Sequence, residues 1–189
     1  MMRYLPLLLT SLGLLSACAS NAPTYYQLPV QVSAAPNQAQ VNYSVKVRMA
    51  DFLNSSSMVY EVSDVEVVLS KQNLWAENPE QSVARNLAYK LNQAQSKAGF
   101  YTRGSRPNDI LVQLDQFQGS HHGQVKLSGQ FTIQSAGLKP ITQPFSISIA
   151  QEGDGYRAMV QALDQGLAQL AQSIASQLPS KPNVKGFLL

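Results

Sequence analysis

The sequence predicts an α+β fold, a two-layer sandwich in which a largely antiparallel or mixed sheet of about six strands carries two main helices on one face. Two observations predict this fold. The strand-like segments alternate apolar and polar residues, which leaves each segment with a single apolar face. Two longer segments instead repeat apolar residues at helical spacing. Because both kinds of element have one apolar side to bury, packing the helices on the sheet satisfies both.

The first strands are short and bounded by turn residues. A strand that begins at residue 25 stops at Pro29, and the segment 41–49 has its apolar residues at odd positions. Two further segments, 58–62 and 65–69, alternate again but change phase at the dipeptide between them. That change of phase indicates a turn or a bulge between two strands.

The next element is a helix with clear start and stop signals. Asn78 is the predicted N-cap, and Pro79 takes the first helical position. Gly99 is predicted to be the left-handed residue that follows the helix, with Phe100 as its hydrophobic partner. The apolar stripe between these ends comprises Val83, Leu87, Leu91, Ala94 and Ala98.

The second half of the chain is predicted to be an antiparallel meander of three strands followed by a helix. Apolar residues alternate in the segments 110–117, 125–133 and 145–149, and Gly129 marks a close approach of the backbone. Gly153-Asp154-Gly155 then ends the strand pattern and opens the helix. The apolar stripe of this helix comprises Val160, Leu163, Leu167, Leu170, Ile174 and Leu178.

The N-terminus has the pattern of a lipoprotein signal. Arg3 supplies a positive charge, and residues 5–15 form an apolar run that is too short to remain in a bilayer as a permanent helix. The run ends in Leu15-Ser16-Ala17-Cys18, which resembles the lipobox of bacterial lipoproteins. That resemblance implies cleavage before Cys18, a diacylglycerol on its sulfur and a fatty acid such as palmitate on its new amino group. The alternative is an ordinary signal peptide followed by a buried core cysteine.

Cys18 is the only cysteine, so the folded domain has no disulfide and depends on its core. Several acyl chains hold a protein on a membrane almost permanently. In enterobacterial-type sorting an Asp after the lipidated cysteine would retain the protein at the inner membrane. Ala19 therefore predicts a lipid-anchored protein on the periplasmic face of the outer membrane. The predicted segments are a signal peptide (1–17), the lipidated cysteine with a short linker (18–24), the folded domain (25–179) and a C-terminal tail (180–189).

Several aromatic and apolar residues are candidates for contact with a partner or with the membrane. Tyr25 and Tyr26 either rest at the membrane interface, where amphipathic rings are favoured, or pack at the start of the sheet. Trp75 either stacks on a ligand or partner or covers the core. The tail ends in Phe187-Leu188-Leu189, which docks either on its own domain or on a partner.

The chain lacks the spacing of a catalytic or metal centre. His121 and His122 are adjacent, would point to opposite faces of a strand and have no third ligand indicated, so we predict no metal site and no cofactor. We find no nucleophile elbow and no phosphate-binding glycine loop, and we expect no enzyme. A lipid-modifying hydrolase would need one of these histidines against a buried serine. The net charge of +3, without a run of basic residues, does not indicate nucleic acid.

With its elements placed, the mature chain resembles the PqiC/YmbA family of ABC-type transport auxiliary lipoproteins over nearly its full length. The order and spacing of short motifs carry the resemblance. One departure is the loop 51–57, where family members often have a Pro-Tyr-Leu-Asp-Arg-like segment. The matching segments are the lipobox at Cys18, Tyr25-Tyr26-Gln27-Leu28-Pro29, Val45-Lys46-Val47, Val59-Tyr60, Leu74-Trp75-Ala76-Glu77, the helix 83–91, the hairpin from Phe117 through Gly123 into 127–133, and a closing helix rich in Ala and Leu.

The resemblance implies an outer-membrane lipoprotein that faces the periplasm and docks an MCE-domain protein anchored in the inner membrane, whose tube spans the periplasm. It also implies a non-catalytic homo-oligomer that forms a ring. We therefore expect a docking or auxiliary subunit of an intermembrane lipid transport system that supports envelope integrity. The alternative is a stand-alone envelope lipoprotein that binds an apolar ligand or a cell-wall component. An apolar cavity between sheet and helices would favour this alternative, and a closed core would favour docking.

Overall fold

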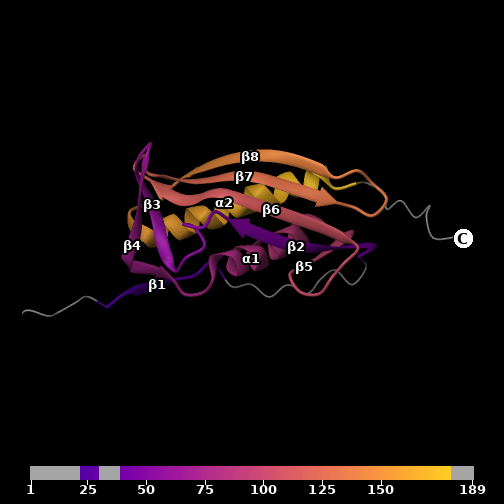
Figure 1. The fold of residues 1–189 in the computed structure, drawn as a ribbon, viewed down its shortest axis with the longest axis horizontal. Helices are drawn as coiled ribbons and strands as arrows, with labels where there is room; N and C mark the ends of the chain where they lie inside the picture. The colour runs from indigo at the N-terminus through magenta and orange to yellow at the C-terminus, as the bar shows by residue number, and fades with distance from the viewer. Residues whose placement is uncertain (1–21, 30–38, 180–189) are drawn as a thin grey trace, which may run out of the picture.

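A computed structural model describes residues 22–29 and 39–179, in which two helices cover one face of a mixed sheet (Figure 1). This arrangement confirms the predicted α+β class, with eight strands where about six were expected. Helix α1 spans Pro79–Ala94 and helix α2 spans Gly155–Gln177. The strands are β1 (Thr24–Tyr26), β2 (Val41–Met49), β3 (Ser57–Ser63), β4 (Glu66–Trp75), β5 (Ala98–Tyr101), β6 (Asn108–Ser120), β7 (Gln124–Gln134) and β8 (Ile141–Ala150).

Strand β6 lies at the centre of the sheet. Strand β7 pairs antiparallel with it along its length and β8 pairs antiparallel with β7, which confirms the predicted meander. The other edge of β6 is shared, because β2 lies parallel to residues 108–114 and β3 lies parallel to Gly119 and Ser120. From there the sheet continues outward from β2 to β5, and from β3 to β4 and β1. Two groups of strands therefore diverge from one edge of β6.

An extra residue in β6 bends the meander. The pairing of β6 with β7 shifts between Leu114 and Gln116, as at a β-bulge. Across from it, Gly129 has φ +152°, and a Cβ at this position would lie 2.0 Å from the carbonyl oxygen of Gln113. Only glycine permits so close an approach, which confirms the interpretation of Gly129.

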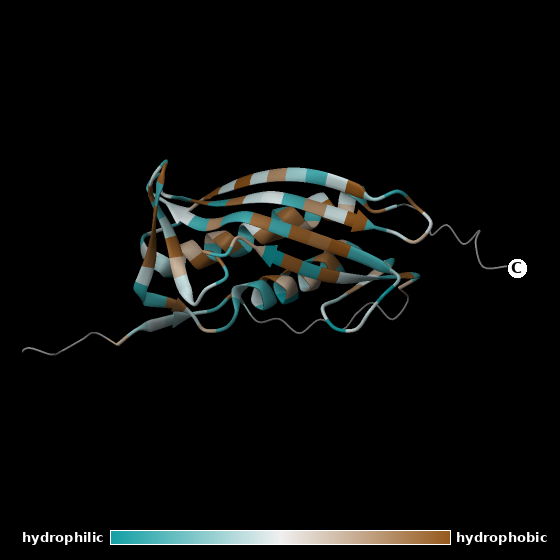
Figure 2. Cartoon of the chain, viewed as in Figure 1, coloured by the Kyte–Doolittle hydropathy of each residue, from teal (hydrophilic) through white to brown (hydrophobic). Residues whose placement is uncertain are grey.

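The two helices pack their apolar stripes onto the sheet. Helix α2 lies on β6, β7 and β8, while α1 packs against β2, β5 and α2. The predicted cap of α1 is present, since Asn78 Oδ1 accepts a hydrogen bond from the backbone N–H of Gln81 at 3.1 Å. Figure 2 shows the alternation of brown and teal residues along β2 and β6. The buried apolar residues of both layers form one continuous cluster.

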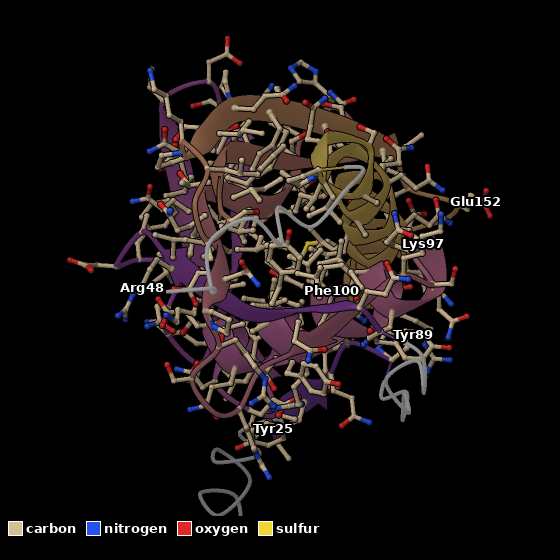
Figure 3. The ribbon with its side chains drawn as sticks, turned by 90° about the vertical axis from the view of Figure 1, so that its right-hand side faces the viewer. Tyr25, Arg48, Tyr89, Lys97, Phe100 and Glu152 are labelled. Carbon is tan, nitrogen blue, oxygen red and sulfur yellow. The ribbon has the colours of Figure 1, made fainter. Side chains whose placement is uncertain are left out.

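The end of α1 differs from the prediction. The helix ends at Ala94, and the residues that follow form β5, which pairs parallel with β2. Gly99 is therefore part of a strand and does not adopt the left-handed conformation. The cause is nonlocal, because Asn92 donates a hydrogen bond to the carbonyl of Phe100 and accepts one from its N–H, both at 3.0 Å. This clamp holds the segment extended at the edge of β2, and Figure 3 shows Phe100 in the interior of the molecule.

Candidate docking surface

The hairpin of β3 and β4 extends away from the helix-covered part of the sheet, at the left in Figure 1. We call residues 57–69 the arm. Its two strands pair antiparallel, and residues 64 and 65 form the turn that the change of phase predicted. Only Tyr60 and Glu61 of the arm pair with β6, so the hairpin is held by the rest of the sheet at one short crossing.

Five apolar side chains of the arm are exposed to solvent. Val65, in the turn, is 97% exposed. Successive strand residues point to opposite faces, so the exposure of three consecutive residues in β4 means that β4 is open on both faces here. Met58 and Val59, on β3 at the root of the arm, are buried. Contiguous apolar surface on a folded protein marks a site of interaction. The exposed apolar residues of the arm are Val62, Val65, Val67, Val68 and Leu69.

This surface was not predicted from the sequence, because the alternation in the segment 65–69 predicts an ordinary strand with one apolar face. The signal that was overlooked is Val68, an apolar residue at an even position between two apolar neighbours. A strand that is apolar on both faces is either buried on both sides or exposed on one of them.

The root of the arm is fixed by polar contacts. The Tyr60 hydroxyl donates to the carbonyl of Ser120 at 3.0 Å. Glu61 is only 4% exposed, and its carboxylate lies 2.6 Å from Lys126 Nζ and accepts a further hydrogen bond from Gln118 Nε2 at 3.4 Å. The backbone N–H of His121 donates to the carbonyl of Glu61 at 2.9 Å. A buried charge requires such partners, so the arm has a firmly held root and an open tip.

Strand β1 places the two candidate tyrosines differently. It pairs parallel with the end of β4, which aligns Tyr25 with Leu74 and Tyr26 with Trp75. Tyr25 is 60% exposed and lies at the periphery in Figure 3. Tyr26 is half-buried, and its hydroxyl donates to the Asn73 side chain at 3.3 Å. Of the pair, Tyr25 is therefore free to contact a partner or a membrane, while Tyr26 packs at the start of the sheet.

The start of the domain and the arm share one end of the molecule. Figure 1 shows β1 and the arm at the left, with β5 and the β7–β8 turn at the right. Thr24 pairs with Asn73, which lies four residues beyond the arm on the same strand, or about 13 Å along it. Neither helix of the described residues is long and apolar enough to cross a membrane.

Trp75 is part of the hydrophobic core, which was one of its two interpretations. It is 7% exposed and stacks on Phe117, with ring centroids 6.0 Å apart. It therefore presents little surface for a partner. The predicted lipidation site Cys18 and the tail residues Phe187, Leu188 and Leu189 lie outside the described residues.

The histidines have an arrangement that the sequence did not indicate. They lie in the β6–β7 turn, with ring centroids 3.9 Å apart, so they do not point to opposite faces of a strand. The carboxylate of Asp64 in the arm lies within 4.8 Å of a nitrogen of each ring. Ser120 is fully buried beside His121, but its hydroxyl has no hydrogen-bond partner among the described residues. The serine–histidine pair that a hydrolase needs is therefore not formed here.

Comparison with known proteins assigns the chain to a family. Residues 26–175 match the family described as the ABC-type transport auxiliary lipoprotein component. The intermembrane transport lipoprotein PqiC of Escherichia coli K12 is 30% identical over 178 residues, which cover 89% of this chain and 94% of PqiC. The PqiC protein of Shigella flexneri matches to the same extent.

Two solved structures share the fold. An uncharacterized protein of known crystal structure is 30% identical and superposes with a TM-score of 0.74, over 84% of this chain and 99% of that one. A Xanthomonas campestris protein superposes with a TM-score of 0.63 at 14% identity, over 80% of this chain and 92% of that one, and shows the fold alone. The family match and the identity to PqiC agree over nearly the same residues. The chain therefore belongs to the PqiC/YmbA family and is a transport auxiliary lipoprotein of the cell envelope.

Proposed function

We propose that this protein is anchored through Cys18 to the periplasmic face of the outer membrane and docks an MCE-domain protein that is anchored in the inner membrane. In this role it is a non-catalytic auxiliary subunit of an intermembrane lipid transport system that supports envelope integrity. The proposal includes a signal peptide over residues 1–17, a linker over 18–24 and a C-terminal tail over 180–189. The observation that carries it is the group of five exposed apolar side chains between Val62 and Leu69 of the arm.

The position of the arm supports docking at the anchored end. Thr24 begins β1 six residues after Cys18, so an extended linker reaches roughly 20 Å. This tether keeps β1, and with it the neighbouring arm, close to the lipid surface. A tube that delivers lipid to the outer membrane must end at the same level. Tyr25, exposed on β1, suits the headgroup region there.

The packing of the core favours docking over the binding of an apolar ligand. The buried residues of the sheet and both helices form one continuous cluster. Side chains of the sheet and of the helices thus contact one another directly between the layers. A stand-alone ligand-binding lipoprotein, the alternative above, would instead need an apolar cavity at this position.

The free edge of β8 supports a homo-oligomer. Among the described residues β8 pairs only with β7, and its ten residues include no charged side chain. Monomeric proteins usually protect such an edge with charge, with proline or by covering it, and of these β8 has one proline, Pro144. We propose that β8 contributes to the contacts of a ring. Ser148→Lys, which places a charge on the exposed side of this strand, should reduce the mass of the assembly measured by light scattering.

The direct test is co-purification with an MCE-domain protein from the same envelope. The double variant Val67→Ser, Leu69→Ser removes two exposed apolar side chains from one face of the arm. If each contributes about 1 kcal/mol to docking, affinity falls by about thirtyfold. Leu138→Ser is the matched control, because Leu138 is 38% exposed in the β7–β8 turn, at the opposite end of the molecule from the arm (Figure 1). If both variants retain the partner equally, the arm is not part of the docking site.

The anchor is tested separately. Cys18→Ala should release the protein from the membrane fraction without changing its unfolding midpoint, since the domain begins after the linker. Mass spectrometry of the natural protein should show an acylated N-terminal cysteine. A Cys18→Ala protein that still sediments with membranes would contradict the anchor.

A further inference from the structure

We propose that Asp64, His121 and His122 form a binding site for a divalent transition-metal ion, which bridges the tip of the arm to the β6–β7 turn. The three side chains come from two turns that are far apart in the sequence, and their ligand atoms all lie within 4.8 Å of one another. The inference does not depend on the docking role proposed above.

The geometry needs only small side-chain movements to bind an ion. Ligand atoms around a tetrahedral zinc ion are about 3.4 Å apart, since Zn–N and Zn–O bonds are about 2.0 to 2.2 Å. His122 Nε2 already lies 4.0 Å from Asp64 Oδ1. The side chains of His121, His122 and Asp64 are 34%, 56% and 85% exposed, so rotation of their side-chain bonds is not blocked by core packing. Closing the site therefore requires an approach of roughly 1 Å with no change in the backbone.

Beside His121 lies the buried carboxylate of Glu61. Its Oε1 is 3.9 Å from His121 Nδ1. A carboxylate on one side of an imidazole ring orients the ring so that its other nitrogen faces a metal, an arrangement that is common around zinc. The Lys126 ammonium, 2.6 Å from the same oxygen, holds Glu61 in this place. The site thus has a supporting group as well as three ligands.

The donor set selects the class of ion. Two imidazole nitrogens and one carboxylate oxygen suit Zn²⁺, Cu²⁺ and Ni²⁺, whereas Mg²⁺ and Ca²⁺ prefer sites made of oxygen alone. The remaining coordination position is open to water. His121 and His122 are the only histidines of the chain, and its only cysteine is at position 18. A second strong site for Zn²⁺ within one chain is therefore not expected.

Bound metal would hold the arm more firmly. In the structure the arm is connected to β6 and its turn at its root, by the two-residue pairing of β3 with β6 and by hydrogen bonds of Tyr60 and Glu61. A bridge from Asp64 to the histidines would close the hairpin tip onto the β6–β7 turn. The ion would therefore slow opening of the surface that carries Val65 and its apolar neighbours.

The test titrates zinc chloride into the full-length lipoprotein in detergent, purified through a tag without histidine and treated with N-ethylmaleimide to block any free thiol. We expect one Zn²⁺ per chain by calorimetry and no binding of Mg²⁺. Asp64→Asn and His122→Gln should each weaken binding by at least about tenfold. Glu66→Gln is the matched control, because it removes the same charge from an exposed strand end beside the same turn and should bind zinc as the parent does.

Hydrogen exchange provides the second readout. Zinc should slow amide exchange in residues 57–69 and 120–124 of the parent and of Glu66→Gln, but not of Asp64→Asn. Absence of saturable zinc binding would overturn the proposal. So would unchanged affinity in Asp64→Asn, or an equal loss in Glu66→Gln, which would indicate general attraction of cations. A zinc-dependent doubling of mass in light scattering would place the site between chains and would also overturn it.

Discussion

The β3–β4 and β6–β7 hairpins are both antiparallel and both rich in Val, Leu and Ile, but they differ in what covers them. On β7, Val125, Leu127, Phe131 and Ile133 are at most 1% exposed, because α2 packs on this strand. On the arm, the apolar residues from Val62 to Leu69 are 39% to 97% exposed. Among the described residues neither helix packs on the arm as α2 packs on β7.

The residue pattern of a strand therefore does not decide whether its apolar face is buried. A strand buries its apolar face only where a second layer covers it. The two helices of this chain cover the meander and β2. The exposed part of the arm, from Val62 to Leu69, lies beyond them, whereas Met58 and Val59 at its root belong to the core. If that account is right, the same substitution should have very different effects on stability in the two hairpins.

The largest difference is expected for Leu→Ala. Leu127 is fully buried, and its methyl groups fill the space over Gly166 of α2, where a Cβ would lie 2.6 Å from Leu127 Cδ1. Leu127→Ala should lower the free energy of unfolding by about 3 to 4 kcal/mol, measured by urea denaturation. Leu69→Ala, at a residue 42% exposed, should cost less than about 1 kcal/mol. Similar losses at the two sites would contradict the view that only β7, and not the arm, is covered by a second layer.

The next largest effect is expected at Gly129, beside the β-bulge of the β6–β7 hairpin. Gly129→Ala should lower the free energy of unfolding by about 3 kcal/mol, because the new Cβ would collide with the backbone carbonyl of Gln113 and the residue would keep a positive φ. Gly123→Ala in the β6–β7 turn is the control. It also has a positive φ but meets no atom within 4 Å, so it should cost clearly less. Equal costs would mean that strain in φ, and not the collision, governs both sites.

A smaller effect is expected at the root of the arm. Lys126→Ala leaves the Glu61 carboxylate buried without its cation, but the Lys126 side chain is 25% exposed, so water compensates in part. We expect a loss of about 1 to 2 kcal/mol, less than for a fully buried pair. Lys46→Ala, which removes the exposed partner of Asp109, should cost under about 0.5 kcal/mol. Hydrogen exchange should show that Lys126→Ala loosens the arm and leaves the meander protected.

The smallest effect is expected for an isosteric change in the open part of the arm. Val67→Thr keeps a β-branched side chain at a residue 40% exposed, and should change the free energy of unfolding by less than about 0.5 kcal/mol. Val125→Thr buries the same hydroxyl in β7 and should cost about 2 kcal/mol. Chemical denaturation of this pair sharpens the comparison, because the substitution is identical and only the covering layer differs. A costly Val67→Thr would mean that the arm is covered in solution.

Much of the fold could be predicted from local patterns. The one-faced strands, the cap at Asn78, the meander and the helix opened by Gly153-Asp154-Gly155 all follow from residue spacing and backbone preference. The backbone contact at Gly129 also follows, because an isolated glycine inside a strand has few other uses. These features depend on residues that are close together in the sequence.

Other features could not be predicted in this way. The glycine after a helix usually stops it, but here Asn92 and the edge of β2 hold Gly99 in a strand. Trp75 had two interpretations, and its burial against Phe117 favours the core. In each case a contact with a distant segment outweighed the local preference.

The sequence by itself determined which residues are apolar on which face, where the helices begin and the lipoprotein signal pattern at its N-terminus. Only the tertiary structure decided that the arm lies outside the helical layer, and that Asp64 meets His121 and His122. The physical reason is that the periodicity of a helix or strand sets the direction in which each side chain points. Whether that side chain is buried, and which distant residues it contacts, depends on how the elements of the whole chain pack on one another.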